Sequence, residues 1–473
     1  MNINELQELL GLLDDSVQVA DGKALVLDGE KLKANIFRLA EVSALGTGPR
    51  QGYARYLTRL IAIAHGIYPA SIHEMYMARG RGEIPSNFTV PAINLRALSF
   101  DAAKAVFRAA ATLHAGPILF EIARSEMGYT NQNPAEYSTN ILAAAISEGY
   151  SGPVFIQGDH FQVSPKRYGT DPETELQALR DLIQEAIGAG FYNIDVDTST
   201  LVDLSVESIP DQQSLNTDLS AMFTNYIRTL EPDGVTISVG GEIGEVGGHN
   251  STEEELRAYM DGFTEKLAEL DNRAVGLSKI SIQTGTSHGG VVLPDGSIAQ
   301  VSVDFDTLLR LSRVSREDYG MAGAVQHGAS TLPEDAFGKF TESEACEVHL
   351  ATNFQNMLFD RLPENLRDEM YEYLDENHND ERKPDMTDEQ FYYKTRKRVI
   401  GAFKAQTWDL PADKMDEICS AWEAQFGKLF ELLGLTNTRN FIEQTITPVL
   451  IAPELDYYLK LEADEEDVSD LAD

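Results

Sequence analysis

Cysteine, tryptophan and positive charge are scarce in this chain. Its 473 residues include two cysteines, two tryptophans and 38 Lys and Arg against 76 Asp and Glu, so the formal net charge is −38. Two cysteines, Cys346 and Cys419, provide neither a disulfide framework nor a cysteine-based zinc site. The acidic excess argues against a nucleic acid or an anionic membrane surface as a partner.

Long apolar runs are also missing. No run approaches the roughly 20 residues of a membrane span. The first ten residues lack the basic stretch and the apolar segment of a secretion signal. Gly46-Thr47-Gly48-Pro49 lacks the Gly-Lys-Ser/Thr ending of a phosphate-binding loop and is interpreted as a turn. We therefore expect a cytoplasmic protein that does not interact with membranes.

Short apolar runs rich in β-forming residues alternate with segments of helical spacing in the middle of the chain. Eight such runs occur, at 88–95, 117–122, 154–157, 193–196, 235–239, 279–283, 322–326 and 346–350. Strands that alternate with helices predict an α/β fold, a parallel (β/α)8 TIM barrel. A doubly wound open sheet is the competing fold. The recurrence of polar motifs at several strand ends favours the barrel.

The flanking regions follow a different pattern. Residues 1–85 are expected to form a helical N-terminal extension, 86–355 the barrel domain, and 356–473 a C-terminal helical region with an acidic tail. Helices packed outside a barrel can also cover a second subunit, so a homo-oligomer is expected.

Three of the predicted strands each end at a histidine. Asp159-His160, His288-Gly289 and His327-Gly328 follow the strand-like runs. Parallel strands place their carboxyl ends on one rim, so His160, His288 and His327 are predicted to converge. Three imidazoles around an open position are typical of a catalytic zinc site. Each histidine taken singly would more simply be a hydrogen-bonded residue at a strand end.

Carboxylates occur beside these histidines. Asp159 could act as a general base or could orient a metal ligand. Asp197 shares one strand face with Asp195, which is costly inside a barrel unless the charges are solvated, paired or metal-bound. Glu242 lies in a glycine-rich segment after the fifth strand and could bind the metal. Glu245 or His249 could move protons from the same segment, which could instead be a mobile surface loop.

In this order, the motifs resemble the class II, metal-dependent fructose-bisphosphate and tagatose-bisphosphate aldolases. The similarity runs from about Phe88 to Gln355. It is carried by segments 89–94 (TVPAIN), 158–160 (GDH), 194–199 (IDVDTS), 242–248 (EIGEVGG), 284–289 (TGTSHG) and 326–330 (QHGAS). The combination is specific, although no single segment is.

The resemblance implies a zinc-dependent lyase that cleaves a ketose phosphate, such as fructose 1,6-bisphosphate, to dihydroxyacetone phosphate and an aldehyde. It implies Zn²⁺, or another divalent metal, as cofactor and a small sugar or sugar phosphate as substrate. The site residues implied are, for the metal, His160, His288, His327, Glu242 and Asp197; for catalysis, Asp159, Glu245 and His249; and for substrate binding, Asn94, Gly289, Gly328, Ser330, His349 and Thr352.

The chain departs from the family pattern at the substrate end. His249 stands where the family usually has Glu after the Gly-Gly pair. His349 replaces an Asn of the last strand, Ala351 replaces an Asp, and Ala123 replaces a Ser of the second strand. These changes leave two further functions open. One is a metal-dependent epimerase of a sugar or sugar acid, and the other is a non-catalytic accessory subunit.

Overall fold

Eight parallel strands close into a barrel at the centre of the molecule. The computed structural model describes residues 3–244, 249–285, 293, 302–460 and 471. The barrel strands are β4 (Val90–Asn94), β5 (Leu119–Ala123), β6 (Gly152–Gln162), β7 (Asn193–Asp197), β8 (Ser238–Glu242), β9 (Lys279–Ile282), β10 (Ala324–Gln326) and β11 (Glu347–Leu350). Each pairs in parallel with the next, and β11 pairs with β4, which closes the sheet. The predicted barrel is confirmed, and each predicted run overlaps one strand.

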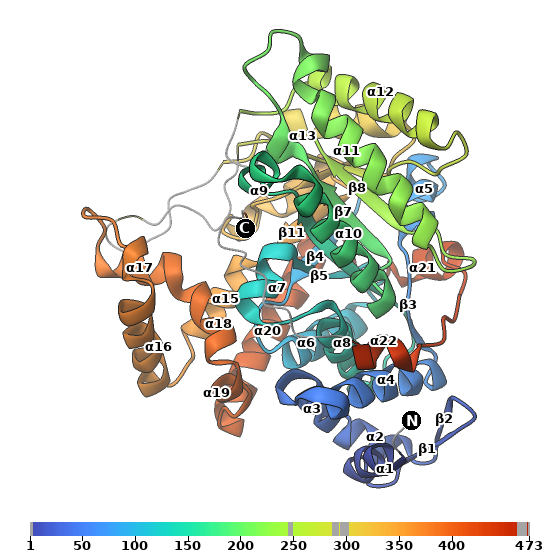
Figure 1. Ribbon diagram of the computed structural model, residues 1–473, viewed down its shortest axis with the longest axis vertical. Helices are drawn as coiled ribbons and strands as arrows, with labels where there is room; N and C mark the ends of the chain where they lie inside the picture. The colour runs from blue at the N-terminus through green and yellow to red at the C-terminus, as the bar shows by residue number, and fades with distance from the viewer. Residues whose placement is uncertain (1–2, 245–248, 286–292, 294–301, 461–470, 472–473) are drawn as a thin grey trace.

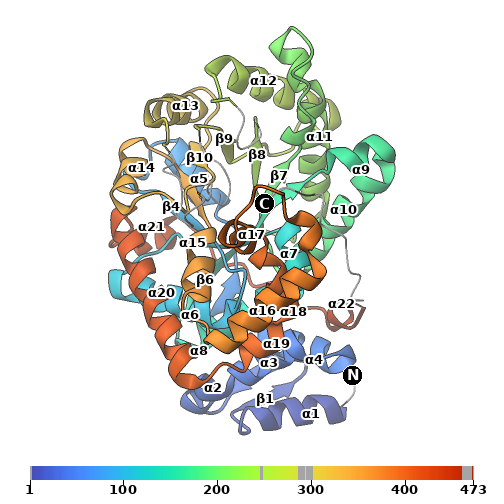
Figure 2. The same ribbon diagram turned by 90° about the vertical axis from the view of Figure 1, so that its left-hand side faces the viewer.

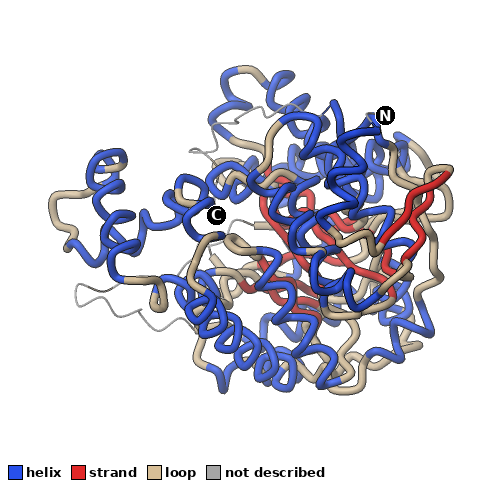
Figure 3. The backbone as a smooth tube through the Cα atoms, turned by 90° about the horizontal axis from the view of Figure 1, so that it is seen from below, coloured by secondary structure: helices blue, strands red, loops and turns tan. Residues whose placement is uncertain are grey.

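Helices surround this barrel, as Figure 3 shows. β4, β5, β7, β8, β9, β10 and β11 are buried along their whole length, because barrel strands are covered on both faces. The helices between and after the strands are α6 (Ser99–Leu113), α7 (Arg124–Thr130), α8 (Pro134–Ser147), α9 (Pro165–Thr170), α10 (Pro172–Ala189), α11 (Ile209–Leu230), α12 (Glu253–Leu270), α13 (Phe305–Glu317), α14 (Gly338–Glu342) and α15 (Thr352–Phe359), with 3-10 turns at Ser199–Leu201 and Glu334–Ala336.

The N-terminal region contains strands that its helical pattern did not predict. Its elements are α1 (Ile3–Leu12), β1 (Val17–Ala20), β2 (Lys23–Val26), α2 (Gly29–Asn35), α3 (Phe37–Leu45), α4 (Gly48–Ala64), β3 (Ile67–Pro69) and α5 (His73–Gly80). β1 and β2 form a hairpin whose turn places Asp21 and Gly22 at φ values of 51° and 70°. An Asp-Gly pair between alternating residues is a hairpin signal. β3 pairs with the start of β6 and ties this region to the barrel.

The C-terminal region is helical (Figures 1 and 2). It comprises α16 (Glu364–Asn377), α17 (Asp388–Thr395), α18 (Val399–Ala402), α19 (Lys404–Trp408), α20 (Ala412–Leu432), α21 (Arg439–Thr445) and α22 (Leu455–Lys460), with 3-10 turns at Asn379–Glu381 and Arg396–Arg398. α20 packs on α6, and α18 packs on α7. In the described part of the chain, no helix is long and apolar enough to cross a membrane.

A buried histidine at the start of α5 makes the fold sensitive to acid. The His73 side chain is buried, and its Nδ1 has no hydrogen-bond partner among the described residues. Burial lowers the pKa of His73 from 6.5 to about 4. The unfolded chain therefore takes up a proton near pH 6.5, whereas the folded chain does so only near pH 4. Stability from this group is present above pH 6.5 and is lost as the pH falls towards 4.

Replacing His73 with glutamine should reduce this loss. A difference of 2.5 pKa units corresponds to about 3 kcal/mol of folding free energy. Urea unfolding of the wild type and the variant is measured at neutral pH and near pH 4. The stability lost between the two pH values is then compared between the proteins, which cancels any constant cost of the substitution. Parallel pH profiles for the two proteins would contradict the account.

Candidate metal centre and cavity

A bulge in β6 lets two adjacent residues face the barrel interior. Pairing between β6 and β7 shifts register between Gly158 and Phe161, and His160 has a φ of 38°. A side chain at position 158 would collide with the Phe161 ring, so glycine is required there. Adjacent residues of a regular strand face opposite ways. The bulge instead brings both Asp159 and His160 to the rim formed by the carboxyl ends of the strands.

His160 and His327 meet at this rim, as the sequence predicted. His160 Nε2 lies 3.0 Å from His327 Nδ1. On its other side, His160 Nδ1 lies 3.1 Å from Asp197 Oδ2 and 3.3 Å from Glu242 Oε2. His327 Nε2 lies 3.0 Å from the hydroxyl of Ser281, on β9. The four predicted metal-binding residues that the structure describes therefore form one buried cluster. The fifth, His288, lies outside the described residues.

The carboxylates of this cluster have strongly perturbed pKa values. Burial raises the pKa of Glu242 to about 7, and the neighbouring Asp197 carboxylate adds to the effect. Burial also acts to raise the pKa of Asp197. There, hydrogen bonds from His160, Gln162 and Ser199 outweigh burial and lower the pKa. Asp197 is thus a stabilised anion held against His160.

Asp159 lies beside this cluster and has polar partners on two sides. Its Oδ2 accepts a hydrogen bond from Asn94 Nδ2 at 2.8 Å, and its Oδ1 lies 3.2 Å from His349 Nδ1. Burial alone would raise the pKa of Asp159, but the imidazoles of His160 and His349 outweigh burial and hold it well below its usual range. Asn94 also donates to Glu126 at 2.9 Å, which fixes the amide between two carboxylates.

The predicted substrate-binding residues Ser330 and Thr352 and the predicted proton-transfer residue His249 have hydrogen-bond or ion-pair partners outside the cluster around His160. Ser330 Oγ accepts a hydrogen bond from the backbone N–H of Ala351 at 2.6 Å, so one lone pair of its hydroxyl is already used. Thr352 Oγ1 accepts from Arg96 at 3.5 Å. His249 is exposed, and its Nε2 lies 2.7 Å from Glu255 Oε1 at the start of α12. Two further predicted residues, Glu245 and Gly289, lie outside the described residues.

A cavity of about 690 Å³ opens above Asp159 and His160. The barrel contributes its floor, which includes Asn94, Asp159, His160, His327, Gly328, Ser330, His349 and Thr352. The C-terminal region contributes part of its wall, which includes Lys383, Met386, Gln390, Tyr393, Lys394 and Lys397. The sequence did not link these residues to the site, because lysines in a polar, charged region also fit a solvated surface.

A buried charged network around Lys279, Glu347 and His349 lies beneath the cavity, and no sequence motif predicted it. Lys279 Nζ lies 2.9 Å from Asp195 Oδ2 and 2.5 Å from Glu347 Oε1. Glu347 Oε1 also lies 2.7 Å from His349 Nε2, and His349 Nδ1 lies 3.1 Å from Glu121 Oε1. Polar residues two apart within buried strands, such as Glu347 and His349, were the signal that could have revealed it.

The carboxylates of this network have pKa values shifted in opposite directions. Burial, reinforced by the Asp159 carboxylate, raises the pKa of Glu121 to about 8. Burial also raises the pKa of Asp195, to about 6, although Lys279 opposes it. At Glu347, Lys279 and His349 outweigh burial and lower the pKa to about 2. The network therefore holds more carboxylates than Lys279 alone can compensate.

The chain belongs to the class-II fructose-bisphosphate aldolase family, which it matches over residues 85–407. Among solved structures, it is similar to a probable tagatose 6 phosphate kinase from Sinorhizobium meliloti 1021, with 16% identity over 78% of this chain and 96% of that chain and a TM-score of 0.51. It is also similar to the YdjI aldolase from Escherichia coli K12, with 13% identity, coverage of 78% and 98%, and a TM-score of 0.46.

A putative fructose-1,6-biphosphate aldolase from Coccidioides immitis is 18% identical, over 77% of this chain and 96% of that chain, with a TM-score of 0.43. At these identities the structural similarities concern the fold alone. No curated protein sequence matches the chain.

Proposed function

We propose that the protein is a zinc-dependent aldolase that reversibly cleaves a ketose phosphate, such as fructose 1,6-bisphosphate, to dihydroxyacetone phosphate and an aldehyde. The observation that carries this proposal is the meeting of His160, His327 and Glu242 beside Asp159, where the two histidines and Asp159 line one cavity. Membership of the class-II aldolase family supports the same reaction.

The donor set fits a divalent transition metal. Imidazole nitrogens and carboxylate oxygens are the usual protein ligands of zinc. His160 and His327 would hold the ion with Glu242, and His288 is proposed as a further ligand. The metal, when bound, supplies a Lewis acid that polarises the ketose carbonyl.

Asp197 is better suited to orient His160 than to bind the metal. Its Oδ1 accepts hydrogen bonds from Ser199, at 2.7 Å from the hydroxyl and 3.0 Å from the backbone nitrogen. Its Oδ2 accepts from Gln162 at 2.9 Å and lies 3.1 Å from His160 Nδ1. A carboxylate behind a metal-binding imidazole fixes the tautomer and the direction of the ring. We assign this role to Asp197 in place of the ligand role expected from the sequence.

Asp159 is proposed to move the proton of the substrate hydroxyl. In cleavage, the hydroxyl on the carbon that becomes the aldehyde loses its proton as the carbon–carbon bond breaks, and Asp159 accepts that proton. In condensation Asp159 returns it. Its low pKa keeps the carboxylate ionised at neutral pH. Glu245 or His249 is proposed to exchange the proton at the nucleophilic carbon.

The wall of the cavity supports an anionic substrate. Lys383, Lys394 and Lys397 line it together with Arg96, in a chain whose net charge is −38. A concentration of positive charge at the cavity attracts anionic ligands. Phosphate groups of the substrate would meet these side chains from the C-terminal region.

Replacing Asp159 with asparagine tests the proposal. We expect kcat for cleavage to fall by about 10²–10⁴-fold, the usual contribution of a positioned acid–base group, while KM changes little. Steady-state assays with a ketose bisphosphate measure both constants. As a control, Lys266 on the exterior helix α12 is replaced with alanine, which should leave both unchanged. A variant D159N with at least one third of the wild-type kcat would contradict the role.

A second function is favoured by the residues that replace family side chains. Ala123, His349 and Ala351 all line the cavity, and the two alanines offer no side-chain donor to a phosphate. This change suits an epimerase that uses the same metal chemistry on a sugar acid. The two reactions differ in product, because an epimerase yields an isomer and no triose.

A further inference from the structure

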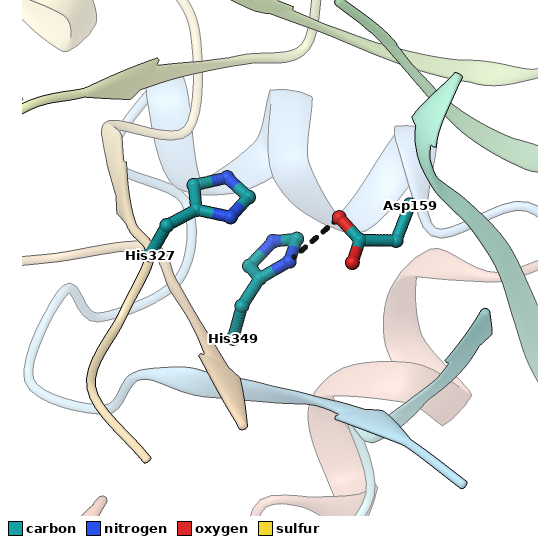
Figure 4. Close-up of side chains that lie close together, drawn as sticks. All are labelled: Asp159, His327 and His349. Atoms are coloured by element: carbon teal, nitrogen blue, oxygen red, sulfur yellow. Dashed lines mark ion pairs between the residues drawn. The ribbon is translucent and has the colours of Figure 1, made fainter. Parts of the chain in front are cut away.

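The two oxygens of Asp159 face different parts of the cavity. Oδ1 pairs with His349 Nδ1 at 3.2 Å, an ion pair marked in Figure 4, which also shows His327 beside the His349 ring. Oδ2 accepts a hydrogen bond from Asn94 at 2.8 Å, and Asn94 also donates to Glu126 at 2.9 Å. The Asn94 side therefore connects Asp159 to side chains that no metal assignment involves.

Glu126, on this side, holds Arg96 in a fixed position. Its Oε1 accepts a hydrogen bond from Arg96 Nε at 2.6 Å. Its Oε2 accepts from Asn94 and, at 3.0 Å, from the backbone nitrogen of Ala123. The side chains of Arg96 and Glu126 are only 9% and 2% exposed. A side chain held by packing and hydrogen bonds of this kind is preorganised for binding. Arg96 is thus a positioned cation at the cavity wall.

The contacts of Arg96 Nη1 leave room for a better partner. Nη1 lies 3.5 Å from Thr352 Oγ1 and 3.3 Å from Gln355 Oε1, whereas such hydrogen bonds usually measure about 2.7–3.2 Å. Arg96, Thr352 and Gln355 all line the cavity. Guanidinium groups bind phosphate and carboxylate oxygens at shorter distances and often through two parallel hydrogen bonds. An anionic oxygen of a ligand would therefore replace these neutral contacts with a stronger one.

A second cation reaches this wall from the C-terminal region. Lys397, in the 3-10 turn Arg396–Arg398, lines the same cavity, and its ammonium lies 5.4 Å from the centre of the Tyr129 ring. Tyr129 follows Glu126 by three residues on α7, so the two side chains share one face of that helix. Arg96 and Lys397 therefore both contact the same face of α7.

α15 holds the same two parts together from the other side. Gln355 contacts Arg96, and the next residue, Asn356, donates to the Tyr393 hydroxyl at 3.2 Å and accepts a hydrogen bond from Arg396. Both α7 and α15 thus contact Arg96 and the segment 393–397. The packing of the C-terminal region on these two helices places Lys397 and Arg96 at one part of the cavity.

We propose that Arg96 and Lys397 form a subsite for an anionic group, a phosphate or a carboxylate, at the aldehyde end of the substrate. The choice of end rests on the proposed function, in which Asp159 serves the hydroxyl of the carbon that becomes the aldehyde. Asn94 and Glu126 connect Asp159 to Arg96. The protein therefore selects ketoses with an acidic group at the end remote from the carbonyl. Anion binding itself does not depend on turnover.

Isothermal titration of the zinc-loaded, full-length protein tests the subsite. The probes are glycerol 3-phosphate and glycerate, which carry the two acidic end groups, with neutral glycerol as a blank. We expect Arg96→Gln and Lys397→Gln each to weaken binding of the preferred anion by about 10–100-fold, the usual loss for a hydrogen bond to a charged group. Lys414→Gln makes the same change on α20, outside the cavity lining, and should bind as the wild type does.

The condensation reaction provides a readout that a merely structural role would not change. With dihydroxyacetone phosphate as the other substrate, kcat/KM is measured for glyceraldehyde 3-phosphate and for neutral glyceraldehyde. We expect the preference for the phosphorylated aldehyde, expressed as the ratio of the two values, to fall by about 10–100-fold in R96Q and in K397Q. Circular dichroism confirms that each variant is folded.

The outcomes separate this proposal from the proposed function. A folded R96Q or K397Q with wild-type affinity for both anions contradicts the subsite, and so does a wild-type protein that binds neither. K397Q leaves the pair of Arg96 and Glu126 intact, so the test stands even if R96Q does not fold. Tighter binding of glycerol 3-phosphate or of glycerate identifies the end group as phosphate or carboxylate. Anion binding that both variants weaken, in a protein that releases no triose, refutes the aldolase and keeps the subsite.

Discussion

Replacing His327 with alanine lowers turnover of a ketose phosphate by about 10³-fold or more and removes one bound metal ion. Metal polarisation of a carbonyl contributes several kcal/mol to transition-state stabilisation, and each 1.36 kcal/mol is worth about tenfold in rate. His327 Nδ1 lies 3.0 Å from His160 Nε2, so its loss takes a central donor from the cluster. Steady-state kinetics and elemental analysis of the purified variant measure the two effects.

Ser281 provides a matched control for this result. Its hydroxyl lies 3.0 Å from His327 Nε2, on the side of the ring away from His160. A residue that orients a metal-binding imidazole typically contributes about 10–100-fold to metal affinity. Ser281→Ala should therefore need more zinc for half-maximal activity but reach nearly full turnover when saturated. If H327A instead keeps both its metal and a rate within tenfold of the wild type, His327 is not a ligand.

Replacing Lys279 with methionine destabilises the protein by about 3–5 kcal/mol, the usual cost of leaving a buried ion pair without one partner. Lys279 contacts Asp195 and Glu347 in the interior of the barrel, where all three side chains are buried. Burial acts to lower the pKa of Lys279, but these two carboxylates outweigh it and raise the pKa. The ammonium is therefore charged throughout the neutral range. Urea unfolding at neutral pH measures the loss.

A double variant separates charge from packing. Combining K279M with Glu347→Gln removes one of the two carboxylates that K279M leaves unpaired. It should thus recover part of the lost stability, a non-additivity expected for residues in contact. The wild type and E347Q complete the cycle. A loss below about 1 kcal/mol in K279M would show that water or another cation compensates these carboxylates, which contradicts the assigned role of Lys279.

The barrel could be predicted because its strands are short, buried and separated by helices. Eight apolar runs gave the strand number and order directly. The hairpin of β1 and β2 was missed because four-residue strands with mixed exposure lack a strong apolar pattern. Only the turn at Asp21 and Gly22 marks it clearly. The pairing of β3 with β6 is a long-range contact of three residues and leaves no local pattern.

The candidate site could be predicted where motif residues end adjacent strands. His160, His327, Asp197 and Glu242 meet for that reason. The ring of carboxylates around His349 was missed because its members come from four strands, β5, β6, β7 and β11, and no local motif links them. The lysines of the C-terminal region were missed because their approach to the cavity depends on how that region packs on the barrel. Predictions for His288, Glu245 and Gly289 fall outside the described residues.

Product analysis by nuclear magnetic resonance tests the central claim most directly. The zinc-loaded protein is followed over time with ketose bisphosphates, ketose monophosphates and unphosphorylated keto-sugar acids, with and without a chelator. We expect dihydroxyacetone phosphate and an aldehyde from a phosphorylated ketose, and no reaction once the chelator has removed the metal. An isomer formed without free trioses, or cleavage that persists after the metal is removed, would contradict it.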